Sequence, residues 1–173
     1  MNDADVERLF RTYNLHLVRY LTRRLGDRDW AEEVAQETFV RALRQDRIDN
    51  ERAWLFTVAN NLVRDEARKD ARRRRHLTLL LAEQREAIEE PASAPLERAQ
   101  EAAMARRAME QLAERDRLAL LMREEGLDYN EIAAALDLSV GSIGTTLARA
   151  RRRLVEAYES LQGGDTESAH AAS

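Results

Sequence analysis

Cysteine is absent from the chain, and only two prolines and six glycines occur among its 173 residues. Without cysteine the chain can form neither disulfides nor thiolate metal sites, which fits a reducing cytoplasm, and we expect a cytoplasmic protein. The scarcity of helix breakers favours long helices, and alternation of apolar and polar residues typical of strands is rare. The sequence therefore predicts an all-α fold.

Long hydrophobic runs are missing as well. No stretch approaches the length that a membrane-spanning helix needs, and the N-terminus is polar and acidic, unlike a signal peptide. With 44% hydrophobic and 35% charged residues, the composition is typical of a soluble globular protein. We expect no direct membrane insertion.

Residues that would carry enzyme chemistry are scarce too. The three histidines, His16, His76 and His170, lie far apart and have no histidine partner at helical ligand spacing. The chain has no glycine-rich phosphate loop and no arrangement of nucleophile and base. We therefore expect no metal, no cofactor, no small-molecule substrate and no enzymatic activity.

Residues 126–154 have the pattern of a helix-turn-helix. Asp128 is suited to cap the first helix, and Glu131 completes a capping box three residues later. Asp137 and Leu138 form the turn, and Ser139 can cap a second helix. The second helix has an apolar stripe at spacings of three and four, made by Val140, Ile143, Leu147, Ala150 and Leu154.

The opposite face of this second helix is polar and small at its start and rich in arginine at its end. The N-terminal part of such a helix enters a major groove, and arginines at the far end suit phosphates. The alternative is an ordinary helical hairpin with a solvated basic face. The candidate residues for binding duplex DNA are Ser139, Gly141, Ser142, Thr145, Arg149, Arg151, Arg152 and Arg153.

Two further helices are predicted at the start of the chain. Apolar residues from Phe10 to Leu25 recur at helical spacing, and Gly26 is suited to end that helix. Asp29 can cap the next helix, whose apolar stripe leaves a mostly acidic outer face. This outer face consists of Glu32, Glu33, Gln36 and Glu37.

A third helix is predicted to begin near Glu51 and to place Trp54, Leu55, Val58 and Leu62 inward. Beyond them the chain becomes strongly basic, which indicates salt-sensitive contacts with phosphates. The alternative is a solubilising helix end, helped by cations near the C-terminal dipole. The basic residues are Arg64, Arg68, Lys69 and the four arginines at positions 72–75.

The net charge of −4 conceals a basic front, an acidic middle and a basic second helix of the helix-turn-helix. Helical periodicity fades in the acidic, proline-containing residues 83–97, which we predict to be a flexible linker. It joins two small helical domains, residues 1–82 and 98–160. The small, polar residues 161–173 are predicted to be a disordered tail.

Roughly residues 5–158 resemble the extracytoplasmic-function (ECF) sigma factors of bacterial RNA polymerase. Residues 29–39 look like the family's region 2.2, residues 53–65 look like the run spanning its regions 2.3 and 2.4, and residues 126–154 look like its region 4.2. A helix-turn-helix alone is widespread. These blocks in this order and spacing are specific, and they imply an alternative sigma factor that recognises minus-35 and minus-10 promoter elements and promotes DNA melting.

The resemblance also implies roles for particular residues. The acidic face at Glu32, Glu33, Gln36 and Glu37 corresponds to the surface that binds core polymerase, whose β′ and β subunits are the expected partners. The loop of residues 45–52 corresponds to the one that captures a flipped minus-10 base. The residues implied in minus-10 binding and melting are Asp49, Asn50, Arg52, Asn61, Arg64, Arg68 and Lys69.

The C-terminal domain would bind the minus-35 element, but its recognition helix departs from the common pattern. Many relatives have a lysine and an arginine early in this helix, where this chain has Gly144 and Thr146. Short side chains cannot make the bidentate arginine–guanine contact. We therefore expect Ser142 and Thr145 at base edges, arginines at phosphates, and some dependence on DNA shape. The resemblance implies control by an anti-sigma factor as well.

Two other functions remain open at this point. A stand-alone helix-turn-helix regulator would bind duplex DNA as a dimer without polymerase, and would leave residues 54–75 unexplained. A pure interaction protein that occupies polymerase without opening DNA would leave the recognition helix unexplained.

Overall fold

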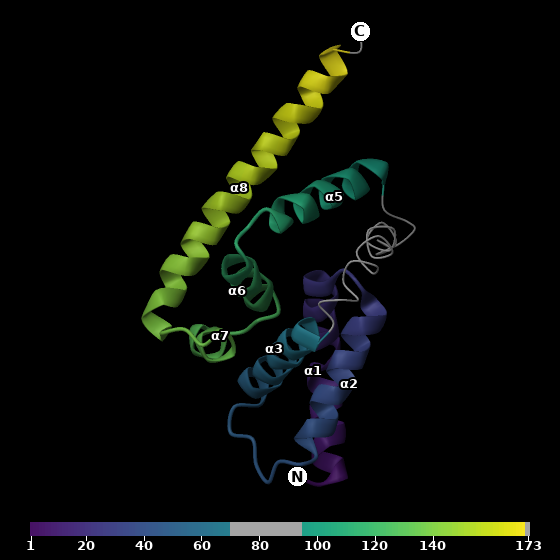
Figure 1. Cartoon of the computed structure of the whole chain (residues 1–173), viewed down its shortest axis with the longest axis vertical. Coiled ribbons are helices and arrows are strands. Elements are labelled where there is room, and N and C mark those ends of the chain that lie inside the picture. Colours follow the sequence, from purple (N-terminus) through teal and green to yellow (C-terminus); the bar gives the residue numbers. More distant parts are fainter. Residues whose placement is uncertain (70–94, 172–173) are drawn as a thin grey trace. The chain divides into compact units, whose positions relative to one another are not determined.

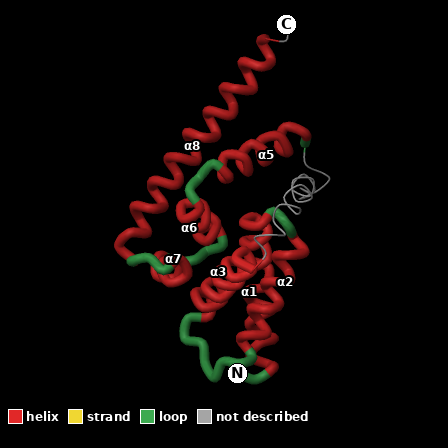
Figure 2. The backbone as a smooth tube through the Cα atoms, viewed as in Figure 1, coloured by secondary structure: helices red, strands yellow, loops and turns green. Residues whose placement is uncertain are grey.

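The computed structural model describes residues 1–69 and 95–171 (Figure 1). All regular structure in these residues is helical, with loops between the helices (Figure 2), so the prediction of an all-α fold is confirmed. The helices are α1 (Asp3–Leu25), α2 (Arg28–Ala42), α3 (Glu51–Lys69), α5 (Leu96–Glu110), α6 (Glu114–Glu124), α7 (Tyr129–Leu136) and α8 (Val140–Ala171).

Two compact units divide the chain differently from the boundaries predicted from sequence. Unit 1 comprises Met1–Ile88 and Leu121–Val140, and unit 2 comprises Glu89–Leu120 and Gly141–Ser173. Residues 121–140 had been assigned to the C-terminal domain, yet they cluster with the N-terminal helices. The predicted linker, residues 83–97, lies outside the described residues up to position 94, and α5 already begins at Leu96.

Helices α1, α2 and α3 form the core of unit 1, because each has an apolar stripe that faces the other two. In α1 the stripe includes Leu17 and Leu21, which are fully buried as predicted. Tyr20 and Phe56 are buried beside each other, with ring centroids 5.0 Å apart. The residues that fill the rest of this core are Leu9, Ala31, Val34, Ala35, Phe39, Ala42, Leu55, Ala59, Leu62 and Val63.

Two aromatic residues expected in this core lie partly outside it. Phe10 is 44% exposed and contacts the ring of Phe39 edge-on. Trp54 is partly exposed, whereas Phe56 is completely buried. The apolar stripe of α3 is therefore centred on residues next to Trp54. Because several adjacent residues of this helix are apolar, periodicity alone does not show which of them are buried.

The ends of α1 and α2 are set by local hydrogen bonds. Asn2 and Asp5 form a capping box at the start of α1, and Gly26 ends the helix in the left-handed conformation with φ of 71°, as predicted. The cap of α2 is Asp27, whose side chain accepts from the backbone N–H of Trp30, so the assignment of Asp29 was wrong. Both aspartates precede the apolar stripe, and only the earlier one has the extended backbone that a cap requires.

Helix α7 packs against α3 within unit 1. It begins with the predicted capping box of Asp128 and Glu131, and Asp137 ends it in the left-handed conformation with φ of 54°. Asn60 of α3 donates its side-chain N–H to the backbone oxygen of Ala135 at 3.3 Å. The last carbonyls of a helix have no partner inside the helix, so this amide satisfies one of them.

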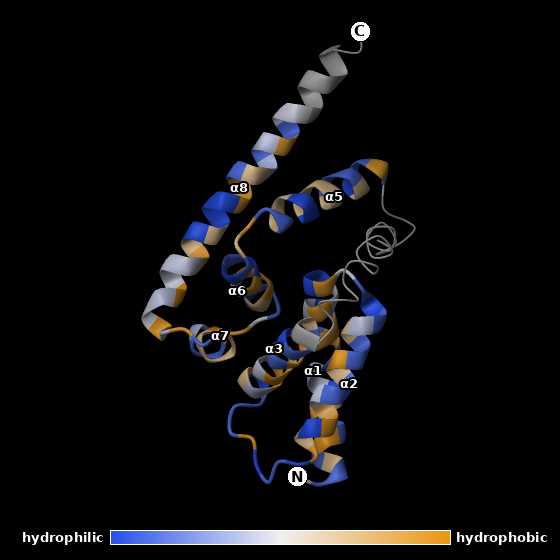
Figure 3. Ribbon diagram, viewed as in Figure 1, coloured by the Kyte–Doolittle hydropathy of each residue, from blue (hydrophilic) through white to orange (hydrophobic). Residues whose placement is uncertain are grey.

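Unit 2 contains α5, the first part of α6 and most of α8. Ile143, Leu147 and Ala150 form the buried stripe of α8, as predicted. Val140, which was expected to begin this stripe, is 47% exposed. A hydrophilic stretch occupies the middle of α8 (Figure 3), where the arginines lie.

Helix α8 continues to Ala171, although residues 161–173 were predicted to be disordered. The prediction rested on the small, polar composition of these residues, which includes a glycine pair at 163 and 164. Inside a helix each glycine lowers the stability by about 1 kcal/mol relative to alanine, and a penalty of this size does not by itself end the helix. The following residues include glutamate and alanine, which favour helix, and no proline.

Truncation of the two α3 aromatics should have unequal effects. Phe56→Ala leaves a cavity beside Tyr20, and we expect it to lower the free energy of unfolding by about 3–5 kcal/mol. Trp54→Ala, at a partly exposed position, should cost about 1 kcal/mol. Urea denaturation followed by circular dichroism measures both. Equal losses in the two variants would contradict this placement of the core.

Candidate nucleic-acid interface

The outer face of α2 carries the predicted acidic residues. Glu33 and Gln36 are exposed. Glu32 and Glu37 are paired with arginines one turn away, Arg28 and Arg41, with 3.0 Å between the charged atoms in each pair. Such exposed pairs contribute little to stability, and they reduce the net negative charge of this face.

The same face of α2 continues into two exposed apolar residues that sequence reasoning missed. Val40 and Leu43 are each 43% exposed. They follow Glu33 and Gln36 at helical spacings of three and four, so all four share one side of the helix. The signal was available in the sequence, because apolar residues at these positions fall outside the buried stripe. The face is therefore acidic at its start and apolar at its end.

The loop between α2 and α3 holds two of the predicted minus-10 residues. Asp49 pairs with Arg47 at 2.7 Å, and both side chains are more than four-fifths exposed. Asn50 accepts a hydrogen bond from the backbone N–H of Ala53 at 3.1 Å, which makes it a cap at the start of α3. The structure thus gives Asn50 a local role that had not been predicted for it.

Helix α3 places its two consecutive asparagines on different sides. Asn61 and Arg64 are exposed, as a surface that contacts DNA requires. Asn60 is 2% exposed, and its side-chain oxygen accepts from the Tyr20 hydroxyl and from Arg24, both at 2.7 Å. The helix extends to Lys69.

The remaining basic residues of this block are outside the described part of the chain. This holds for the side chains of Arg68 and Lys69 and for the four arginines at 72–75.

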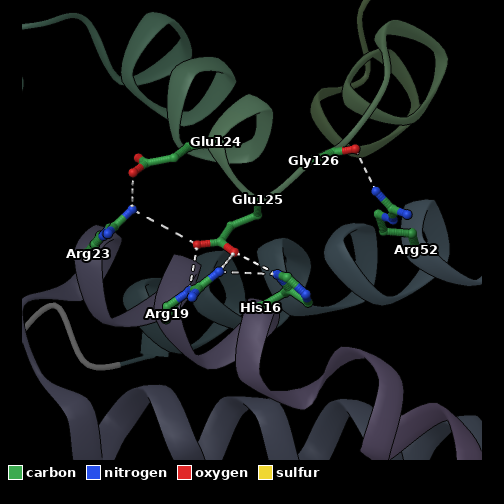
Figure 4. Close-up of polar contacts among 7 residues, drawn as sticks. All are labelled: His16, Arg19, Arg23, Arg52, Glu124, Glu125 and Gly126. Atoms are coloured by element: carbon green, nitrogen blue, oxygen red, sulfur yellow. Dashed lines mark hydrogen bonds and ion pairs between the residues drawn. The ribbon is translucent and has the colours of Figure 1, made fainter.

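Arg52, another predicted minus-10 residue, is engaged elsewhere in unit 1. Its guanidinium donates to the backbone oxygen of Gly126 (Figure 4). It also lies 3.6 Å from the Glu131 carboxylate. Gly126 has a φ of 87°, a backbone conformation that favours glycine, and a Cβ there would lie 3.3 Å from the Arg52 guanidinium. The resemblance to a family did not indicate this contact.

The start of α8 has the small, open surface that sequence predicted. Ser139 precedes the helix, and Gly141 and Thr145 are exposed. Gly141 has nothing within 4 Å of where a side chain would begin. Ser142 is partly buried. Backbone and small side chains can approach a groove closely at this end of the helix.

Thr146, one of the two residues that depart from the family pattern, does not face outward. It is 4% exposed, and its hydroxyl donates to the backbone oxygen of Ser142 at 2.8 Å. The Thr146 side chain is therefore buried at the position where many relatives have a longer basic residue. Gly144 is partly buried.

Two of the four arginines expected at phosphates bind a buried carboxylate within unit 2. The Asp116 side chain is 1% exposed and accepts two hydrogen bonds from Arg149, at 2.7 and 3.2 Å. Arg153 lies 3.4 Å from the same carboxylate. Arg151 and Arg152 are exposed, and no acidic partner for either lies among the described side chains.

Hydrogen bonding from Arg149 holds the pKa of the Asp116 carboxyl below its ordinary value, against the opposing effect of burial. Sequence reasoning missed Asp116, because nothing local distinguishes it from the exposed acids beside it. Only the long-range contact with α8 identifies it.

Clusters of three or more potential metal ligands are absent from residues 1–69 and 95–171. Within that same part of the chain, no helix is both long enough and apolar enough to cross a membrane.

The arginines of α8 should differ in how they affect duplex binding. We expect Arg152→Ala to lower the slope of log K against log salt by about 1, since one phosphate contact is lost. Arg149→Ala should change this slope less, because the guanidinium is held by Asp116. Fluorescence anisotropy with a labelled duplex over a salt series measures both. Equal changes of the slope in the two variants would contradict the expectation that Arg152 contacts a phosphate while Arg149 is held by Asp116.

The Asp116 ion pair should also make stability depend on pH. Its folded pKa is lower than the ordinary 3.8, so its contribution is present above about pH 4 and is lost as pH falls through the lowered value. We expect Asp116→Asn to cost about 1–3 kcal/mol at pH 7 and less in acid. Urea denaturation at several pH values tests this. A difference between wild type and variant that stays constant with pH would contradict it.

Two protein-family models match the chain. The model of Sigma-70 region 2 matches residues 9–73, and that of Sigma-70, region 4, matches residues 102–154. A stand-alone helix-turn-helix regulator would not account for the first match.

Individual relatives agree with these matches. RNA polymerase sigma factor YlaC of Bacillus subtilis is 30% identical over 162 residues, which cover 87% of this chain and 90% of YlaC. The ECF RNA polymerase sigma factor EcfG of Rhodopseudomonas palustris is 34% identical over 137 residues, which cover 75% of this chain and 71% of EcfG.

One solved structure supports the fold. It is the sigma factor RpoE of Bartonella quintana in complex with the anti-sigma factor NepR, with a TM-score of 0.68 and 22% sequence identity. The match covers 90% of this chain and 97% of RpoE. Taken with the two family models and the relatives, it leads to one conclusion: the chain belongs to the ECF sigma factors, alternative sigma factors that direct RNA polymerase to promoters.

Proposed function

We propose that three separate surfaces divide the work of promoter recognition. The outer face of α2 binds core polymerase, the exposed side of α3 binds and opens the minus-10 element, and the start of α8 binds the minus-35 duplex. The observation that carries the proposal is the orientation of α3, in which Asn61 and Arg64 are exposed while Asn60 supports the fold from inside.

The exposed side of α3 has the chemistry that DNA opening requires. Flipping a base out of the stack costs a few kcal/mol, so the opened strand must be held by contacts to bases and phosphates. The Asn61 amide can both donate and accept hydrogen bonds at a base edge, and Arg64, one turn later, can pair with a phosphate. Asp49 in the preceding loop is exposed, and a flipped base would meet it beside its ion-pair partner Arg47.

The outer face of α2 suits a partner that is basic at one end and apolar at the other. Glu33 and Gln36 would meet the basic part, and Val40 and Leu43 would bury apolar area. We include these two apolar residues in the core-binding surface, together with the acidic residues Glu32 and Glu37.

The start of α8 would bind the minus-35 duplex mainly by close fit and backbone contacts. Gly141 and Thr145 are exposed and small, so the helix can sit deep in a groove. Arg151 and Arg152 would pair with phosphates. This arrangement places more of the specificity on DNA shape than on bidentate base contacts.

Two further parts of the proposal concern regulation and connection. We propose residues 83–97 as the acidic tether between the region 2 and region 4 parts, and an anti-sigma factor as the external regulator. The RpoE structure, solved with the anti-sigma factor NepR, supports the second point by analogy of fold.

The test of the proposed division is transcription with purified core polymerase on a pool of genomic fragments. We expect the protein to confer promoter-specific initiation. On the promoters so found, Asn61→Ala should reduce open complexes, detected by permanganate footprinting, by roughly tenfold while core binding is retained.

Gln111→Ala serves as the control, because it removes an exposed amide that lies after α5. Equal loss of core binding and opening in Asn61→Ala would contradict the assigned role. If core gains no specific initiation while the protein alone shifts duplex DNA, a stand-alone regulator is the better explanation.

A further inference from the structure

The Asp116 carboxylate is bound by two arginines of α8 within unit 2. Asp116 lies in the first turn of α6, and its side chain is 1% exposed. Arg149 donates to both carboxylate oxygens, at 2.7 and 3.2 Å, and Arg153 lies 3.4 Å from one of them. One of the two positive charges of these arginines is therefore neutralised inside the protein.

These two arginines follow the part of α8 that would meet a duplex. Positions four apart share one side of a helix, so Arg149 lies one turn after the exposed Thr145, and Arg153 lies one turn after Arg149. Their side chains are 35% and 50% exposed, so both reach the surface. Without an acidic partner, each would be an ordinary ligand for a DNA phosphate.

Asp116 opposes such phosphate contacts in two ways. Hydrogen bonding from Arg149 keeps the pKa of the Asp116 carboxyl below its ordinary value, so the group is charged at neutral pH and repels a phosphate that approaches Arg149. A phosphate that took over the guanidinium would also leave a buried carboxylate without its charged partner, which is strongly destabilising. Asp116 therefore competes with DNA for Arg149 and Arg153.

Packing alone does not account for an acid at this position. Apolar residues of similar volume hold two helices together as well as a buried ion pair does, and often better. On α8 the buried residues Ile143, Leu147 and Ala150 already supply apolar contacts. An effect on DNA binding does account for the charge of Asp116.

We propose that Asp116 limits the affinity of α8 for DNA of any sequence, because it holds and partly neutralises two arginines that would otherwise bind phosphates. This inference rests on the proposed function, in which α8 meets the minus-35 duplex. Phosphate contacts strengthen binding regardless of sequence, so fewer of them mean less sequence-independent binding. The free protein is then not retained on bulk DNA before it meets core polymerase.

Salt-dependent DNA binding by the full-length protein tests this role of Asp116. The probe is a short fluorescein-labelled duplex of random sequence, titrated by anisotropy at neutral pH over a salt series. Asp116→Asn should steepen the slope of log K against log salt by about 1, because one negative charge that opposes the phosphates is removed. At low salt the affinity of this variant for the probe should rise by about tenfold.

Further variants separate the charge of Asp116 from its packing. Asp116→Glu keeps the negative charge and should keep the shallow slope of the wild type. Adding Arg149→Gln and Arg153→Gln to Asp116→Asn should remove the gain in affinity, since the released guanidiniums are gone. Glu156→Gln is the matched control, because it removes the same charge from an exposed position of α8, where salt screens it. It should change the slope less than Asp116→Asn does.

The expected gain differs in sign from the effect of a weakened fold. A merely structural role predicts weaker DNA binding by Asp116→Asn, and circular dichroism at the assay temperature checks that each variant is folded. An unchanged or lower affinity in folded Asp116→Asn would overturn the proposal. An equal gain in Glu156→Gln would overturn it as well, since the total charge of the protein would then explain the effect.

A transcription measurement separates this inference from the proposed function. Unlabelled random-sequence duplex, added before core polymerase, should inhibit initiation by Asp116→Asn several-fold more than initiation by the wild type, because the free variant is retained on it. Equal inhibition would overturn the proposed role of Asp116. Failure of the wild-type protein to initiate at all would instead overturn the proposed function, while the salt slopes would still decide whether Asp116 limits duplex binding.

Discussion

The side-chain amide of Asn60 connects more of unit 1 than any other polar group that we describe. It accepts from Tyr20 and Arg24 of α1 and donates to the last turn of α7, and it is almost completely buried. A buried amide that loses its partners costs about 1–3 kcal/mol, so these helices are bound to one relative position. That position determines which side of α3 faces solvent, and Asn61 and Arg64 lie on that exposed side.

Local features of the fold were predictable because their causes are local. Gly26 ends α1, and Asp128 with Glu131 begins α7, since a cap needs only residues within one turn. The stripe of Ile143, Leu147 and Ala150 follows from helical spacing. The family resemblance could be recognised for the same reason, because short runs of sequence carry it.

Features that depend on distant contacts were not predictable from one sequence. Asp116 meets Arg149 on another helix, and Glu125 meets Arg19 more than a hundred positions earlier in the chain. A buried acid and an exposed acid look alike in sequence, and only the partner distinguishes them. The same limit explains why Arg52, Arg149 and Arg153 were assigned to DNA, although each is held by a carboxylate or a carbonyl of the protein itself.

Arg149 and Arg153 are bound to a carboxylate of the protein itself, and this affects how the minus-35 element can be bound. With Arg151 and Arg152 left for phosphates, the recognition helix would release few counterions, so its own affinity for duplex DNA should be low. Weak contacts become sufficient when a second contact holds the domain near its site, since tethering raises the effective concentration. Binding to core polymerase provides such a tether. A recognition helix that binds poorly alone and well on polymerase would confine promoter recognition to the holoenzyme, which is the state in which opening DNA is productive.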